Sequence, residues 1–203
     1  YPISSVHLRR AIAMAIDKSK FGEFMHGGQT GTGSFIPEGM FGYDKSIGLA
    51  YDPTAAKKEL AKSGIKAGMK IELVSPNWEK NLMVCQYIQG ELKKNLGIDI
   101  SIRSFDHKTF RAQLELYSFP IFLNSWSADY PDPDNFLSVF LGGAGNNRTK
   151  WKNADYDAKV LLARYNQNQK ARLKLYGQAQ KILVEDDMPI LPLYNEPSLA
   201  LVN

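Results

Sequence analysis

The feature that most constrains this chain is a regular alternation of strand-like and helix-like segments between residues 70 and 126. Apolar side chains recur at alternate positions over 70–74 and 98–103, which predicts two β-strands. A nearly continuous apolar run of strand length follows at 120–126. The two intervals between these strands have helical patterns, and crossovers of this length place consecutive strands parallel, with helices on the sheet. The sequence therefore predicts an α/β fold with a parallel βαβαβ core.

Start and stop signals define the helices more closely. Asp52 stands at an N-cap, Pro53 at a first helical position and Gly64 just past a helix end, so a short helix is expected there. Gly97 is expected to end the helix over 79–96 in a left-handed cap. Similar patterns place further helices after Ser4 or Ser5, after Asp106, within 133–141, at 154–166 and at 169–186.

The remaining segments are expected to be irregular or to lie at a sheet edge. Glycines make 22–50 rich in turns. Prolines place the expected strands at 189–194 and 198–202 at an edge, which makes the predicted sheet a mixed one. Four tyrosines fall in amphipathic elements and are expected to belong to the core: Tyr156, Tyr165, Tyr176 and Tyr194.

Composition limits the class of protein. With 203 residues, of which 44% are hydrophobic and 23% charged, residues 1–203 are expected to form a single folded domain. The net charge of +4 comes from basic residues scattered among acidic ones, which argues against a nucleic-acid-binding patch. The lone cysteine, Cys85, rules out an internal disulfide, and its helical apolar surroundings indicate a small buried side chain.

The segment from Trp126 to Phe136 is the most unusual in the chain. It contains three aspartates and two prolines, and it begins where the third predicted strand ends. Ligands of open α/β sheets bind outside the carboxyl ends of the strands. A carboxylate beside an aromatic face suits an ammonium group there, through charge-assisted hydrogen bonding and cation–π attraction. Asp129 and Trp126 are the candidate residues.

Several alternatives remain open for this segment. Its aspartates also fit a solvated turn with helix caps. A calcium site of Asp129, Asp132 and Asp134 is disfavoured, because prolines interrupt the run and it lacks the glycine and late glutamate of calcium loops. A hydrolase with Asp129 and Asp132 as paired carboxylates has little further support, because the histidines are far apart and in no metal-ligand spacing: His7, His26 and His107.

Four stretches together make the chain resemble the family 5 extracellular solute-binding proteins, which serve dipeptide, oligopeptide and nickel importers. The likeness extends through 153–157 and 188–194. The four stretches, read directly from the sequence, are His7-Leu8-Arg9-Arg10-Ala11-Ile12-Ala13-Met14-Ala15-Ile16-Asp17-Lys18, Tyr51-Asp52-Pro53 through Gly64, Glu91-Leu92-Lys93-Lys94-Asn95-Leu96-Gly97-Ile98, and Trp126-Ser127-Ala128-Asp129-Tyr130-Pro131-Asp132-Pro133-Asp134-Asn135-Phe136.

The resemblance implies an architecture and a setting. Family members are longer, two-lobed receptors, so residues 1–203 are expected to be the C-terminal, second ligand-facing lobe, with the N-terminal lobe absent. The implied fold is one lobe of a type II periplasmic-binding-protein fold. The implied role is substrate binding for an ABC transporter, without catalysis, cofactor or metal. The implied partners are the missing lobe and the membrane permease subunits. The implied location is periplasmic or extracytoplasmic, including a membrane-anchored lipoprotein as a form of the full-length protein.

The resemblance also implies site residues. In peptide-binding members, the aspartate at the position of Asp129 takes the α-ammonium group of the ligand. Arginines that hold the ligand carboxylate in some members are not matched, because Leu123 and the segment 75–78 stand there. A nickel chelate, a sugar or an opine therefore remains an alternative to a peptide. The residues implied to line the pocket beside Asp129 are Asn124, Ser125, Trp126 and Ser127.

Overall fold

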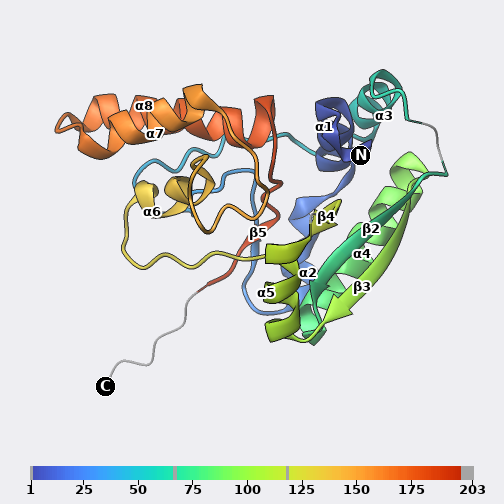
Figure 1. Cartoon of the computed structure of the whole chain (residues 1–203). Coiled ribbons are helices and arrows are strands. Elements are labelled where there is room, and N and C mark those ends of the chain that lie inside the picture. Colours follow the sequence, from blue (N-terminus) through green and yellow to red (C-terminus); the bar gives the residue numbers. More distant parts are fainter. Residues whose placement is uncertain (1, 66–67, 118, 198–203) are drawn as a thin grey trace.

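A three-stranded parallel sheet forms one half of the computed structural model, which describes residues 2–65, 68–117 and 119–197 (Figure 1). The strands β2 (Lys70–Pro76), β3 (Asp99–Phe105) and β4 (Ile121–Phe122) lie in the order β3-β2-β4. The predicted parallel core is confirmed. The third strand is shorter than expected, although the Leu123 amide still donates to the Val74 carbonyl oxygen at 2.8 Å.

Two helices cover opposite faces of this sheet. Side chains alternate between the faces along each strand, so each face has apolar side chains for a helix to cover. The α4 helix (Glu79–Leu96) packs on the face that carries Ile71, Leu73 and Ile100. The α5 helix (His107–Leu116) packs near Val74 on the other face. As predicted, Gly97 ends α4 in the left-handed conformation, with a φ of 67°, and Asp106 caps α5 by accepting from the Thr109 amide.

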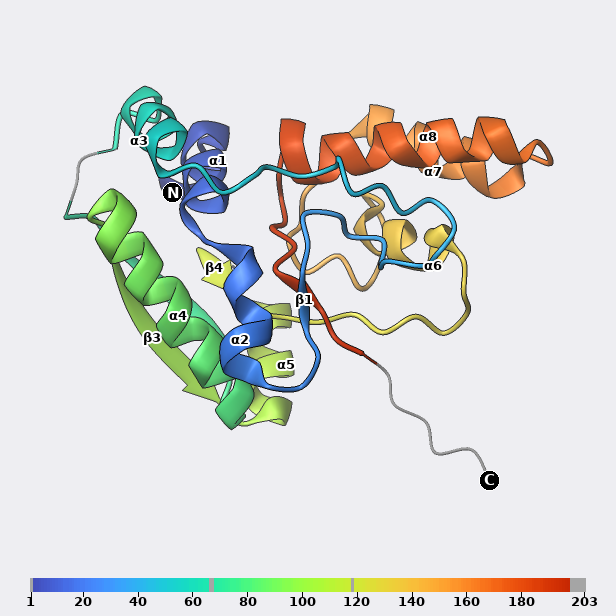
Figure 2. The ribbon, with the colours of Figure 1, turned by 180° about the vertical axis from the view of Figure 1, so that it is seen from behind.

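The sheet half is completed by α1 (Val6–Ala15) and α3 (Pro53–Lys62), which pack together beside the end of α4 (Figure 2). Asp52 caps α3 as predicted. Ser5 is the N-cap residue of α1, but its side chain makes no capping hydrogen bond. The short elements of this half are η1 (Pro2–Ser4), η2 (Lys18–Lys20) and α2 (Phe21–Met25).

A second hydrophobic core lies beyond the sheet, around the α7–α8 hairpin. Tyr156 and Tyr176 are fully buried there as expected, but Tyr165 is 75% exposed, so its assignment to the core was wrong. Tyr165 is the last residue of α7 and lies on the face opposite its buried stripe. The elements are α6 (Pro133–Leu137), η3 (Ser138–Phe140), α7 (Ala154–Tyr165), α8 (Gln169–Lys181) and the π-helical turn η4 (Ile182–Asp186).

The two halves are joined by hydrogen bonds and by a small antiparallel sheet. Arg9 donates to the Asp187 carbonyl oxygen at 2.6 Å and Arg10 to that of Glu185 at 2.9 Å, which satisfies carbonyls at the end of the α8–η4 helix. The strand β1 (Thr30–Gly31) pairs with β5 (Tyr194–Asn195) in a sheet separate from the parallel one. The expected mixed sheet is therefore divided in two.

The predicted strand at 198–202 lies outside the described residues. Within the part of the chain that is described, no helix is long and apolar enough to cross a membrane.

Candidate functional site

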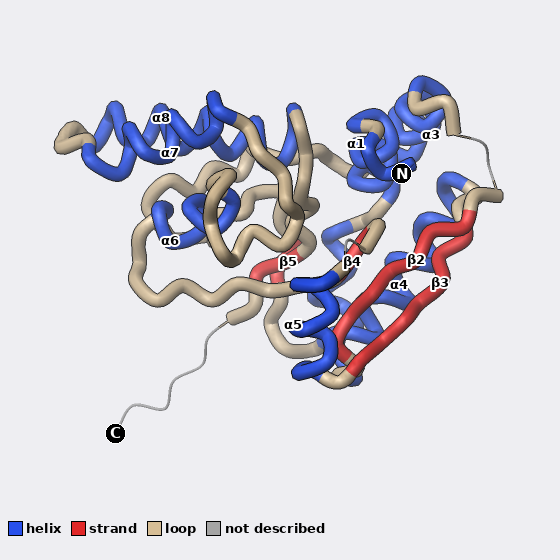
Figure 3. Tube along the Cα trace, in the orientation of Figure 1, coloured by secondary structure: helices blue, strands red, loops and turns tan. Residues whose placement is uncertain are grey.

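A long connection leads from β4 in the sheet half to α6 in the other half, and we call residues 123–132 the ligand loop (Figure 3). The loop begins at the carboxyl end of β4, where the sequence predicted a site. Asn124, Ser125 and Ser127 are exposed. Trp126 is half-buried against the second core, and its indole Nε1 donates to Asn135 Oδ1 on α6 at 2.9 Å.

Asp132 anchors the far end of the ligand loop in two ways. It caps α6, because its Oδ1 accepts from the Asp134 amide at 2.9 Å. It also receives Arg172 of α8, whose Nη2 lies 3.0 Å from Oδ1 and 2.8 Å from Oδ2. The guanidinium group is itself held between aromatic rings, with Cζ 5.6 Å from the Phe41 centroid and 5.4 Å from that of Tyr176.

Asp134 is buried and is likewise paired. Arg164 of α7 donates from Nε to Asp134 Oδ1 at 2.8 Å, and the Tyr130 hydroxyl donates to Oδ2 at 3.0 Å. Burial and the hydrogen bond to Asp134 raise the pKa of Tyr130, which keeps its hydroxyl protonated as a donor. Asp134 thus ties the ligand loop to the α7–α8 hairpin.

Asp129 differs from the other two aspartates of the segment. Its side chain is exposed, and within the described residues it takes part in no hydrogen bond or ion pair. The loop therefore presents a single uncompensated carboxylate, three residues from the half-buried Trp126 ring. Such a group is chemically suited to bind a cation or a donor from outside the chain.

The structure bears on the alternatives raised for this segment. The helix-cap interpretation holds for Asp132. Asp132 and Asp134 are engaged by arginines, which disfavours both calcium ligation and a pair of catalytic carboxylates with Asp129. No group of three or more potential metal ligands occurs among the described residues. Sequence reasoning missed Arg164 and Arg172, which lie 30 and 40 residues from the aspartates they contact and follow no local pattern. It quoted Asn135 within the motif but gave it no role.

The histidines do not form a site. His7 Nδ1 lies 2.8 Å from Glu59 Oε2 on α3, which is a structural contact. His26 ends α2 in the left-handed conformation, with a φ of 53°. The His107 ring stacks on Trp78 at a centroid distance of 5.0 Å, and both residues follow strands of the parallel sheet. The three histidines therefore stay in separate surroundings, as expected.

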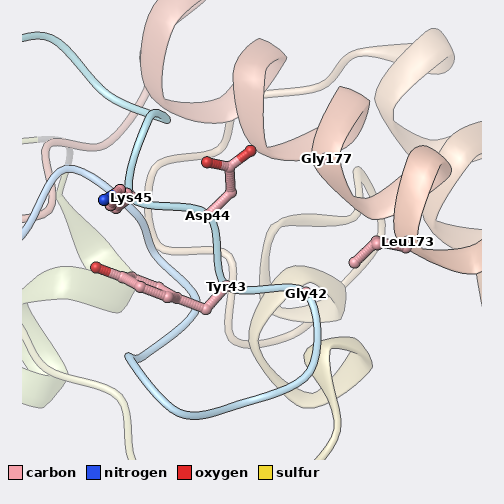
Figure 4. A pocket seen from close by; sticks show the side chains of 6 residues that line it. All are labelled: Gly42, Tyr43, Asp44, Lys45, Leu173 and Gly177. Atoms are coloured by element: carbon pink, nitrogen blue, oxygen red, sulfur yellow. The ribbon is translucent and has the colours of Figure 1, made fainter.

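Two hollows of the surface lie away from the predicted site residues. Figure 4 shows one of about 370 Å³ between the chain at 42–45 and α8, where Asp44 extends toward the helix. Another of about 610 Å³ lies along α7 beside Leu162 and Tyr165. Asp129 lines neither of them. The Asp129 side chain is exposed on the ligand loop, and the assigned site residues stay a prediction.

Known proteins resemble this chain along nearly its whole length. Di/tripeptide-binding protein 2 of Pseudomonas aeruginosa is 34% identical over 95% of the chain, and dipeptide-binding protein DppE of Bacillus subtilis is 27% identical over 100% of it. The chain covers 38% and 39% of these two relatives, so it spans about two fifths of their length.

Solved structures share the fold. The murein tripeptide binding protein MppA of Escherichia coli superposes with a TM-score of 0.88 at 24% identity, over 97% of this chain and 40% of MppA. The peptide-bound OppA of Listeria monocytogenes gives 0.82 at 28% identity, over 96% of this chain and 40% of OppA. The predicted fold class is therefore confirmed.

A family model matches most of this chain. Residues 1–148 match the middle part of the bacterial extracellular solute-binding proteins, family 5. The match includes the parallel sheet, the whole ligand loop and Asp129. The chain therefore belongs to the family 5 extracellular solute-binding proteins.

Proposed function

We propose that this chain is one ligand-facing lobe of a peptide receptor for an ABC importer, and that Asp129 holds the amino terminus of the peptide. The observation that carries this proposal is the exposed carboxylate of Asp129 on the ligand loop, which has no partner among the described residues, beside two aspartates that are paired. A peptide α-ammonium group offers three donors and one positive charge, which complement such a carboxylate.

The comparisons support a peptide as the ligand class. Relatives of this chain are named for binding dipeptides and tripeptides, and the OppA structure contains a peptide. The family is one of solute-binding proteins, so this chain is a binding protein and not an enzyme. Trp126 and the polar side chains of Asn124, Ser125 and Ser127 would then line the bound peptide.

The same proposal includes partners and a location. A second lobe would close over the open face at the ligand loop, and the membrane permease of the importer would receive the peptide. Relatives described as periplasmic support an extracytoplasmic location, free or lipid-anchored. These partners and this location are those of the whole receptor, of which this chain would be one lobe.

A decisive experiment replaces the charge of Asp129 in the two-lobed receptor. The Asp129→Asn variant keeps the shape of the side chain but loses a charge-assisted hydrogen bond at a desolvated site, which costs on the order of 1.5–3 kcal/mol. We expect calorimetry to show a loss of peptide affinity of about tenfold or more.

N-acetylated peptides provide the control, because acetylation removes the ammonium group from the ligand. They should bind the parent receptor weakly and should be insensitive to Asp129→Asn. Equal affinity of the parent and the variant for unmodified peptides would refute the role of Asp129. Preference for a bile acid would instead favour a non-peptide solute, since one relative, 25% identical, is named as a probable deoxycholate-binding protein.

A further inference from the structure

Two arginines from a distant part of the chain pair with two of the three aspartates in the segment from Trp126 to Phe136. Arg172 engages Asp132, and Arg164 engages Asp134. Only Asp129 lacks a partner among the described residues. Without the arginines, three carboxylates within six residues would repel one another and would present up to three negative charges to a ligand.

We propose that Arg172 is a positioning and charge-selecting residue of the peptide site: it fixes the end of the ligand loop and neutralises Asp132, so that the site favours ligands with a single ammonium group at this end. The inference rests on the proposed function of Asp129. It adds the charge class of the ligand and assigns its determinant to α8.

The geometry of Arg172 supports the positioning role. Its side chain is 14% exposed and lies against the Phe41 and Tyr176 rings, so few rotamers remain accessible to it. Nη2 contacts both oxygens of Asp132 and Nε donates to the Ala163 carbonyl oxygen at 3.1 Å. The guanidinium group thus links the α7 end, the α8 helix and the ligand loop.

The short spacing between the aspartates supports the charge-selecting role. Asp132 lies three residues after Asp129, so their Cα atoms are at most about 11 Å apart. This distance is comparable to the screening length of about 8–10 Å at moderate ionic strength. An unneutralised Asp132 would therefore add attraction for a second positive charge on the ligand, such as the side chain of an N-terminal lysine.

Two substitutions at Arg172 separate the two roles. Arg172→Met removes both the charge and the hydrogen bonds. Arg172→Lys keeps a positive charge but cannot reproduce the planar donor fork. Lys174→Met is the matched control, because Lys174 is exposed on the same helix and its loss changes the net charge by the same amount.

The first readout is hydrogen exchange of the ligand-free chain, which requires no ligand. The Asp134 amide donates to Asp132 Oδ1 and the Asn135 amide to the Asp132 carbonyl oxygen. We expect both amides to exchange about tenfold faster in Arg172→Met and in Arg172→Lys, because the anchor that limits local opening is lost. Lys174→Met should leave them unchanged.

The second readout is ligand selectivity, measured by NMR titration of the chain at low salt with Ala-Ala-amide and Lys-Ala-amide. Arg172→Met should increase the affinity for the dicationic probe relative to the monocationic one by about two- to fivefold, the range of an exposed ion pair. Arg172→Lys should leave the ratio unchanged. The double variant Arg172→Met with Asp132→Asn should abolish the gain, since no freed carboxylate remains.

The outcomes distinguish this inference from the proposed function. Parent-like exchange rates together with parent-like selectivity in Arg172→Met would overturn the inference while leaving Asp129 as the ammonium ligand. A gain that persists in the double variant would also overturn it, because Asp132 would not be its source. If the two-lobed receptor binds neither probe, the proposed function fails, and hydrogen exchange still tests the positioning role.

Discussion

At the scale of single residues, Lys18 is an unusual group at the junction between α1 and α2. It is half-buried, and no ion pair joins it to another residue that the structure describes. Burial lowers the pKa of its ammonium group to about 8, because the charged form is the one that loses hydration. The fold therefore disfavours the protonated form of this lysine.

This shift predicts a pH dependence of stability. Below pH 8 the lysine is charged in both the folded and the unfolded chain, and the cost of burying the charge is fully present. Between about pH 8 and 10 the folded chain loses the proton while the unfolded chain, with a pKa of about 10.4, retains it, so stability rises with pH. Lys18→Met should stabilise the chain at pH 7 by roughly 1–3 kcal/mol.

The measurement is urea unfolding of the parent and of Lys18→Met at several pH values. The difference between the two proteins isolates Lys18, because buried tyrosines and Cys85 contribute equally to both. We expect this difference to shrink as the pH rises through 8. A difference that stays constant from pH 7 to 9.5 would show that the lysine is not desolvated in solution.

The residue scale also shows what could be predicted at the site. The sequence selects Asp129 and Trp126 as candidates from one local pattern, an acidic and aromatic segment after a strand. The anchoring of Asp132 and Asp134 does not, because their partners Arg164 and Arg172 belong to helices that carry many other charged residues. Only the packing of α6 against the α7–α8 hairpin selects these two arginines.

At the scale of elements, two helix starts form a natural comparison. Asp52 Oδ1 accepts from the amides of Thr54 and Ala55, both at 2.9 Å, whereas the Ser5 side chain makes no capping hydrogen bond at α1. Asp52→Ala should therefore lower the free energy of unfolding by about 0.5–2 kcal/mol. Ser5→Ala should change it by less than about 0.5 kcal/mol.

Urea denaturation of both variants tests these two expectations. The slope of the unfolding free energy against denaturant should be the same in the parent and the variants. Comparable losses of unfolding free energy in the two variants would contradict the assignment of the caps. Loss of helical structure confined to α3 in Asp52→Ala, measured by hydrogen exchange, would confirm the assignment.

Elements differed in how far the sequence predicted them. The α4 helix matches its predicted range, because a long apolar stripe and a terminal glycine define both ends. The β4 strand is only two residues long, since its chain leaves the sheet for α6 soon after Leu123 pairs with β2. The pairing of β1 with β5 joins segments more than 160 residues apart and depends on the tertiary arrangement of the two halves.

At the scale of the whole molecule, the openness of the ligand loop predicts weak binding by this chain alone. Small-ligand sites normally bury about 70–90% of the ligand, and two-lobed receptors achieve this by hinge closure. On an open face, the ion pair between Asp129 and a peptide ammonium group is worth only about 0–1 kcal/mol. We expect millimolar or weaker dissociation constants for peptides.

NMR titration of the monomeric chain with a peptide mixture measures this affinity, and the two-lobed receptor serves as the comparison. Micromolar binding by the monomer would mean that one lobe holds a complete site. Self-association at high concentration is a separate expectation, because Leu116, Tyr117 and Trp78 are exposed apolar side chains.

The division of the ligand loop has a consequence for how receptors of this kind diversify. In the first part, Asn124, Ser125, Ser127 and Asp129 face solvent, whereas Trp126 and the part from Asp132 onward are fastened to helices α6 and α8. On the proposed function, substitutions at these four exposed positions alter the cargo without disturbing the fastening. On the same proposal, a lineage exchanges one nutrient for another through a few codons, with the rest of the lobe inherited unchanged.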